Sequence, residues 1–133
     1  MKKYSPNAPC PCGSSLKYKK CCQKYHKGAV APTAALLMRS RYSAYAVGDA
    51  AYIMKTTHPQ NSDYTEEKIQ WKEEIMQFCH HTQFLRLNIT KIAEGDTEAY
   101  ISFKAHLSSG ILKEKSRFLK ENGRWYYVDG IFK

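Results

Sequence analysis

The 133-residue sequence predicts an α+β domain preceded by a small cysteine-rich segment. Between residues 33 and 81 apolar side chains recur every three or four positions, as in amphipathic helices. From residue 85 onward apolar and polar side chains alternate, as in strands with one buried face. Helices followed by an antiparallel meander pack on one face of the sheet. Hydrophobic residues make up 43% and charged residues 25% of the chain, which excludes disordered and collagen-like proteins.

Three parts of the chain differ in composition. Residues 1–28 contain four cysteines and seven lysines but no acid. They hold too few aliphatic side chains to form a core, so we expect a bound metal to order them. Residues 29–32 form a predicted linker, and residues 33–133 form the predicted α+β domain.

The first predicted helix lies between Thr33 and Gly48. The threonine hydroxyl suits an N-cap, and the glycine suits the left-handed conformation that ends many helices. The apolar face of this helix repeats at helical spacing and comprises Ala35, Met38, Tyr42 and Tyr45.

Two further helices are predicted before the strands. The second is short, begins after Asp49 as its cap, and ends before Pro59. The third opens at Thr65, and the acids that follow complement the positive end of the helix dipole. Its predicted buried stripe comprises Trp71, Ile75, Phe78 and Cys79.

Three hairpin turns separate the predicted strands: Glu94-Gly95-Asp96, Ser108-Ser109-Gly110 and Asn122-Gly123. The last of these predicts a hairpin most strongly, because Asn-Gly favours the two-residue turn whose twist matches that of the strands. The inward-facing residues of the first two strands are predicted to be Leu85, Leu87, Ile89, Ile101, Phe103, Ala105 and Leu107. In the last strand we expect Trp125 and Tyr127 to share one face of the sheet.

The cysteine cluster predicts a structural zinc site. Its candidate ligands are Cys10, Cys12, Cys21 and Cys22. Four thiolates complete a tetrahedral shell at roughly 2.3 Å per Zn–S bond and leave no open position for catalysis. We expect backbone N–H groups of Gly13, Ser14 and Ser15 to point at the sulfurs. Two disulfides, or reduced thiols without a metal, are the alternatives.

Positive charge is concentrated on the cysteine-rich segment. The formal net charge is +9, of which residues 1–28 carry +7 and the remainder +2. The lysines that we expect to contact a partner are Lys17, Lys19, Lys20 and Lys24. Such a surface suits an acidic partner, such as nucleic acid, anionic lipid or an acidic face of a protein. Nucleic acid binding would be nonspecific and salt-dependent, since the segment lacks a complete base-stacking motif.

Two resemblances follow from these residues. The run CPCGSSLKYKKCC, residues 10–22, resembles the SEC-C motif, named for the zinc-binding tail of the SecA translocation ATPase. The runs LMRSRYSAY (37–45), KTTHP (55–59) and SRFLKENGRWYYVDG (116–130) resemble the bacterial YchJ family. The first resemblance implies the four cysteines as zinc ligands and a chaperone, ribosome or membrane-surface partner. The second implies a cone-shaped domain like nuclear transport factor 2, with a curved sheet around a pocket.

Ten side chains of the domain are candidates for such a pocket. They are Arg39, Arg41, Tyr42, Tyr45, His58, Glu114, Arg117, Trp125, Tyr127 and Asp129. Arg39 and Arg41 lie two residues apart on one helix, so at most one of them points inward. An inward arginine needs either a carboxylate partner, Glu114 or Asp129, or an anionic ligand. The aromatic face beneath the helices forms either core or a small-ligand pocket.

Two functions remain open from the sequence. Our preferred interpretation is a non-enzymatic binding module, in which the basic segment docks on an acidic partner and the cone offers a second binding surface or a ligand pocket. The alternative is a small enzyme of the isomerase or hydratase kind, with His58 and a carboxylate such as Asp129 or Glu114 as acid and base. A purely structural role is the other possibility for His58, in which its side chain forms a hydrogen bond with the backbone at a helix end.

The N-terminus predicts no export. Met1-Lys2-Lys3 leads into polar residues instead of the apolar core of a signal peptide. The longest uncharged apolar run is too short to cross a bilayer. We therefore expect a cytoplasmic protein that is not transmembrane.

Overall fold

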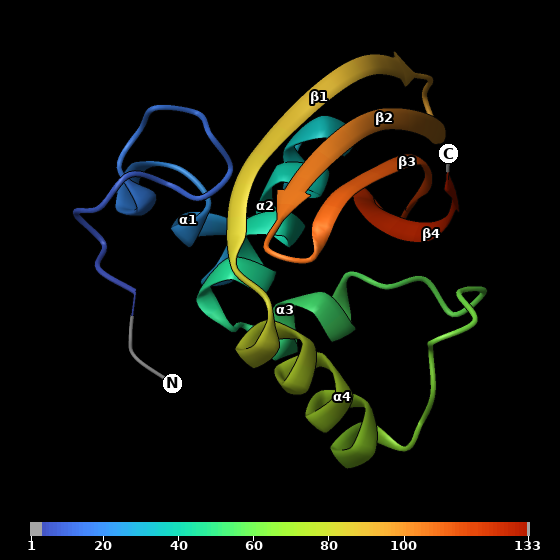
Figure 1. Ribbon diagram of the computed structural model, residues 1–133. Coiled ribbons are helices and arrows are strands. Elements are labelled where there is room, and N and C mark those ends of the chain that lie inside the picture. Colours follow the sequence, from blue (N-terminus) through green and yellow to red (C-terminus); the bar gives the residue numbers. More distant parts are fainter. Residues whose placement is uncertain (1–3, 133) are drawn as a thin grey trace.

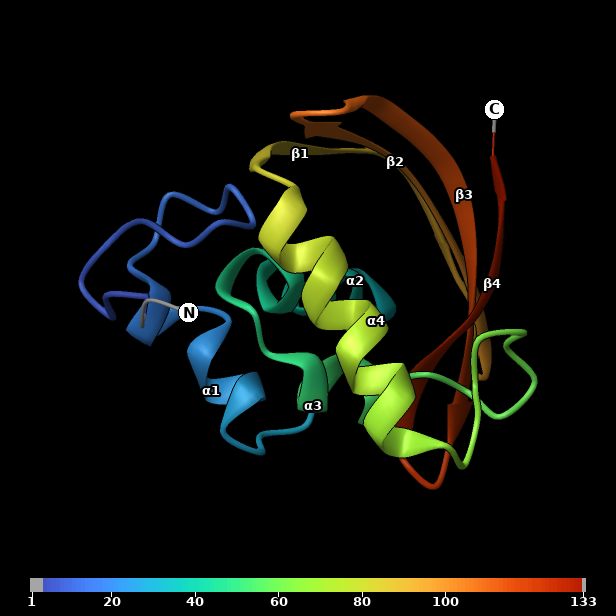
Figure 2. The same ribbon diagram turned by 60° about the horizontal axis from the view of Figure 1, so that its bottom comes forward.

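The computed structural model describes residues 4–132, and within them it shows short and long helices and one four-stranded sheet. The helices are η1 (Tyr18–Lys20), α1 (Gln23–His26), α2 (Ala34–Val47), α3 (Ala50–Lys55) and α4 (Lys68–His81). The strands are β1 (Phe84–Glu94), β2 (Glu98–Leu107), β3 (Gly110–Glu121) and β4 (Arg124–Phe132). The sheet is antiparallel in the order β1-β2-β3-β4 and curves around the helices (Figures 1 and 2). The predicted α+β class is confirmed.

The predicted caps of the first two domain helices are confirmed. Thr33 Oγ1 accepts a hydrogen bond from Leu36 N (3.1 Å), and Gly48 ends α2 in the left-handed region with φ of 80°. Asp49 Oδ1 accepts from Tyr52 N (3.1 Å) and begins α3. Local side-chain chemistry therefore places both helices where the sequence predicts them.

Helix α4 departs from the prediction in two ways. It begins at Lys68, three residues after the expected Thr65, so the acids precede its first turn. Trp71, Ile75 and Cys79 are buried as predicted, but Phe78 is 42% exposed. Phe78 lies at the edge of the stripe and packs edge-on against the rings of Tyr45 and Phe84 at the rim of the sheet.

The strand prediction holds except near irregularities in pairing. Asn122 and Gly123 have positive φ angles of 52° and 78°. A two-residue hairpin turn whose twist matches that of the strands requires positive φ at both residues. In β1 the pairing shifts between Phe84 and Arg86, so Phe84 opposes Leu107 and takes the inward position. Leu85, which we expected inside, is consequently 63% exposed. A bulge of this kind reverses the alternation that the sequence pattern assumes.

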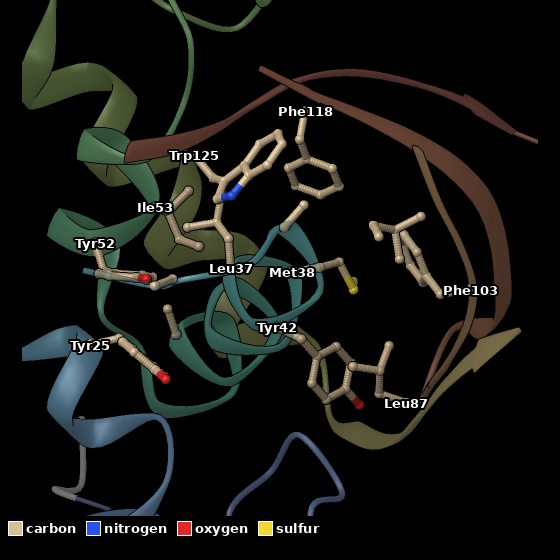
Figure 3. Close-up of a cluster of buried hydrophobic side chains, with 14 of the residues drawn as sticks. Tyr25, Leu37, Met38, Tyr42, Tyr52, Ile53, Leu87, Phe103, Phe118 and Trp125 are labelled. Atoms are coloured by element: carbon tan, nitrogen blue, oxygen red, sulfur yellow. The ribbon is translucent and has the colours of Figure 1, made fainter. Parts of the chain in front are cut away.

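The core lies between α2 and the concave face of the sheet. Figure 3 shows Met38 and Tyr42 of α2 facing Leu87 and Phe103 of the strands, with Phe118 above them. Helix α2 contacts β1, β2 and β4, so it is the central support of the sheet. Among residues 4–132, no helix has the length and apolarity that crossing a membrane requires.

Candidate functional site

A tight backbone turn brings the cysteines together. Pro9 and Lys17 form an antiparallel bridge, and Cys10 N donates to Leu16 O (2.8 Å). Gly13 turns the chain with φ of +82°, a conformation that L side chains rarely adopt. Helices η1 and α1 follow at once, so the second cysteine pair returns to face the first. Short-range backbone hydrogen bonds thus bring the two cysteine pairs close together.

The four sulfur atoms are arranged to hold a metal ion. All four lie within 4.8 Å of one another, and all four cysteines are buried. Two Sγ–Sγ distances are 3.5 Å, between Cys12 and Cys21, and 3.9 Å, between Cys21 and Cys22. A disulfide needs about 2.05 Å, whereas a tetrahedral shell with 2.3 Å bonds has sulfur–sulfur edges of about 3.8 Å. The donor set and its spacing fit a four-thiolate metal site.

Hydroxyl groups support the sulfurs from outside. Ser14 Oγ donates to Cys21 Sγ (3.1 Å), and Ser43 Oγ of α2 lies 3.4 Å from Cys10 Sγ. The expectation that backbone N–H groups contact the sulfurs is wrong for Gly13, whose N–H donates to the carbonyl of Cys10 (3.2 Å). Hydrogen bonds to a thiolate stabilise its charge, so these hydroxyls favour metal binding.

The thiols are electrostatically coupled. Burial raises the pKa of Cys21 to about 11. Hydrogen bonding to Cys10, and then to Cys12, raises the pKa of Cys22. Hydrogen bonds, first from Cys10 and then from Cys22, hold the pKa of Cys12 well below its usual range. A divalent cation must therefore displace the protons of Cys21 and Cys22 to bind all four sulfurs.

The cysteine-rich segment packs on α2. Arg39 Nη1 donates to Cys12 O (2.9 Å), and His26 bridges Tyr18 Oη (2.6 Å) and Ser40 O (2.8 Å). Because a carbonyl only accepts, His26 Nε2 carries the proton, and Nδ1 accepts from the tyrosine. Burial lowers the pKa of His26, which favours this neutral form. Arg39 was expected in the pocket and His26 was not among the candidate residues, yet both join the segment to the domain.

The four lysines that we expected on the segment's surface are exposed in the structure. They are Lys17, Lys19, Lys20 and Lys24. Within residues 4–132, no salt bridge ties any of them to an acid. Lys2 and Lys3, counted in the charge of the segment above, lie outside the described residues.

His58 is held at both ring nitrogens. Nε2 lies 2.7 Å from Glu121 Oε2, and Nδ1 accepts from Gln60 N (3.1 Å). Its carboxylate neighbour is thus Glu121 and not the expected Asp129 or Glu114. The pair borders a hollow of about 460 Å³. With Nδ1 accepting a backbone proton and Nε2 donating to the carboxylate, the imidazole holds no free lone pair to take a substrate proton.

The structure divides the remaining candidates between two faces of the sheet. A cavity of about 260 Å³ on the concave side is lined by five of them: Arg41, Tyr42, Tyr45, Glu114 and Tyr127. Arg117 pairs with Asp129 (3.2 Å) and Glu98 (3.4 Å) outside this cavity. Trp125 joins the core and borders a separate hollow beside Tyr52. The pairing of Arg117 with Asp129 follows from a bulge at Val128, since Phe118 already opposes Tyr127.

Comparison with known proteins defines the class first. A SEC-C motif matches residues 7–24, and the model described as "YchJ, middle NTF2-like domain" matches residues 33–130. NTF2-like means similar to nuclear transport factor 2. A solution structure of a SEC-C motif containing protein from Rhodopseudomonas palustris superposes with a TM-score of 0.80 at 31% identity, over 93% of this chain and 98% of that one. The chain is therefore a SEC-C motif joined to an NTF2-like domain.

The particular family follows from the same comparison. The chain belongs to the YchJ family. It is 42% identical to a UPF0225 protein of Enterobacter sp. (strain 638), over 91% of this chain and 81% of that protein. It is 39% identical to a UPF0225 protein of Streptomyces coelicolor, over 96% of this chain and 98% of that protein. The resemblances drawn from the sequence are confirmed.

Proposed function

We propose that this chain is a non-enzymatic binding protein whose metal-ordered SEC-C segment docks on an acidic partner. One observation carries the proposal. The four cysteines of the segment are buried, whereas its four lysines project into solvent. Exposed cations without acidic neighbours raise the local concentration of polyanions and speed encounter with them.

We infer that the bound ion is zinc in a structural role. Four thiolates in a buried tetrahedral arrangement suit zinc, and a complete protein shell leaves no position for substrate. The ion would be held by Cys10, Cys12, Cys21 and Cys22, and it would fix the backbone that carries the lysines. Binding to the partner then depends on the metal indirectly, through the shape of the segment.

Anchoring on α2 supports a rigid role for the segment. The hydrogen bonds of Arg39 and His26 hold it against the domain, and the Tyr25 side chain joins the main core. A surface that is ordered before binding loses less conformational entropy on association than a flexible tail does. The segment is therefore suited to recognising a partner of defined shape.

The ribosome is the acidic partner to test first, by similarity to the SecA motif. We expect the full chain to co-sediment with purified bacterial ribosomes, with affinity falling at least about tenfold between roughly 50 mM and 200 mM salt. Substituting Lys17, Lys19, Lys20 and Lys24 by glutamate should abolish co-sedimentation. Cys12→Ser should weaken it strongly, because the lysines lose their fixed arrangement.

A charge-matched variant controls for nonspecific attraction. Four exposed lysines of β1, β2 and β3 offer the same change of charge at a different surface: Lys91, Lys104, Lys113 and Lys115. We expect their substitution by glutamate to reduce co-sedimentation much less than the segment variant does. Equal loss in both variants, or ribosome binding that is insensitive to salt, would contradict the proposal.

A further inference from the structure

The concave cavity has a polar inner end and an apolar wall. It lies between the sheet, α2 and α4, and its wall includes the rings of Phe84, Phe103 and Phe118. Phe78 and Phe132 also border it, and both side chains are substantially exposed. A volume of about 260 Å³ accommodates only a small ligand. The apolar wall and the exposed bordering rings would suit the hydrophobic part of such a molecule.

Two buried ions line this cavity without counter-ions. Arg41 and Glu114 are each 7% exposed. Within the part of the chain that the structure describes, neither has an oppositely charged group within 4.0 Å. The expected ion pair of an inward arginine with Glu114 or Asp129 does not form for Arg41 within residues 4–132. Buried charges are usually paired or neutralised, so two unpaired ones in a single cavity require an explanation.

Hydrogen-bonding capacity remains at both ions. Arg41 Nη1 donates to Thr56 Oγ1 (2.7 Å), Ile53 O (3.1 Å) and Thr57 Oγ1 (3.2 Å). Its Nε and Nη2 groups have no partner among residues 4–132. Glu114 Oε2 accepts from Ser116 Oγ and from Tyr127 Oη (3.0 Å), whereas Oε1 accepts from no described residue. The protein thus leaves N–H donors at one ion and an acceptor oxygen at the other.

The Tyr127 side chain contacts both charged groups. The Arg41 guanidinium carbon lies 4.7 Å from the centre of the Tyr127 ring, whose hydroxyl contacts Glu114. Burial, and next the nearby Glu114 carboxylate, raises the pKa of Tyr127, so it remains a neutral donor. Gly130 on the neighbouring strand lacks the Cβ that would collide with the Glu114 side chain. These contacts together fix the positions of the Arg41 guanidinium, the Tyr127 ring and the Glu114 carboxylate.

We propose that the concave cavity binds a small zwitterion with an apolar body, of the chemical class of an aromatic or branched α-amino acid. The ligand's carboxylate accepts from the free N–H groups of Arg41, and its ammonium group donates to Glu114 Oε1. Both contacts are charge-assisted hydrogen bonds, which are stronger than those between neutral groups. The apolar body lies against the phenylalanine wall.

A series of related probes tests the class of ligand on the unmodified full chain. L-phenylalanine carries both charges, phenethylamine lacks the carboxylate, and 3-phenylpropionate lacks the amine. We expect L-phenylalanine to bind tightest by calorimetry and by NMR titration, with shifts at Phe103 and Phe118. Each singly charged probe should bind at least about tenfold more weakly, because one charge-assisted hydrogen bond is lost.

Variants then assign the charges. Glu114→Gln should weaken L-phenylalanine at least about tenfold and leave 3-phenylpropionate binding unchanged. Asp129→Asn, which alters an exposed carboxylate outside the cavity, should leave every affinity unchanged. No binding of any probe, equal affinities across the series, or equal effects of the two variants would overturn the proposal. The probe series needs no variant, so it decides the question even if Glu114→Gln fails to fold, and it does not depend on the SEC-C segment.

Discussion

Replacing Cys12 by serine tests how far the metal supports the fold. Cys12 is fully buried, and its carbonyl accepts the Arg39 hydrogen bond that joins the segment to α2. Serine is a poor ligand for a thiolate site, so we expect the variant to lose the metal. Residues 8–27 should then detach from the domain, because they contain too few apolar side chains to stay folded alone.

The energetic cost follows from the contacts that detachment breaks. The Arg39 bond is charge-assisted and contributes about 1.5 kcal/mol or more, and the His26 bond contributes about 1 kcal/mol. Removing Tyr25 from the core costs a further 1.5 kcal/mol or so. The free energy of unfolding should fall by about 4 kcal/mol, which corresponds to a decrease in Tm of roughly 10 °C or more.

Hydrogen exchange and metal analysis together provide the assay. In the wild type with one bound metal, amides in residues 8–27 should be protected; in Cys12→Ser they should exchange rapidly, while β2 and β3 stay protected. Cys79→Ser is the matched control, because this thiol is buried outside the metal site and its loss should leave metal content intact. Full metal content in Cys12→Ser, or protection of the segment without metal, would refute the reasoning.

Three further outcomes are expected. Phe118→Ala removes a ring that is 1% exposed and should lower the free energy of unfolding in urea by about 3–5 kcal/mol; a loss below about 1 kcal/mol would mean that the core is loosely packed. Gly123→Ala places a side chain at φ of 78° and should cost about 1 kcal/mol in the same assay, with no cost expected if the turn can change type. Burial raises the pKa of Cys79 from 9.0 to about 11, so its neutral thiol contributes stability below pH 9 that is lost as pH rises toward 11. Urea titrations from pH 8 to pH 11 should therefore show a steeper loss of stability in the wild type than in Cys79→Ala, and parallel curves would contradict the assignment.

Much of this protein is determined locally, and local features could be predicted from the sequence. Thr33 and Asp49 cap the helices that follow them, and Asn122-Gly123 forms the expected turn, because each depends on side chains and backbone angles within a few residues. The cysteine cluster belongs to the same category, since all four ligands lie within thirteen consecutive residues. Their spacing alone was enough to predict a cluster that could hold a metal ion.

Only the tertiary structure decided which charged and aromatic side chains meet. His58 joins Glu121 across 63 residues, Arg39 reaches the Cys12 carbonyl, and a bulge places Arg117 against Asp129 outside the cavity. These contacts depend on strand register and on how α2 packs, and a shift of one residue in register moves a side chain to the opposite face of the sheet. Periodicity cannot locate such shifts, because they arise from packing between elements that are distant in the sequence.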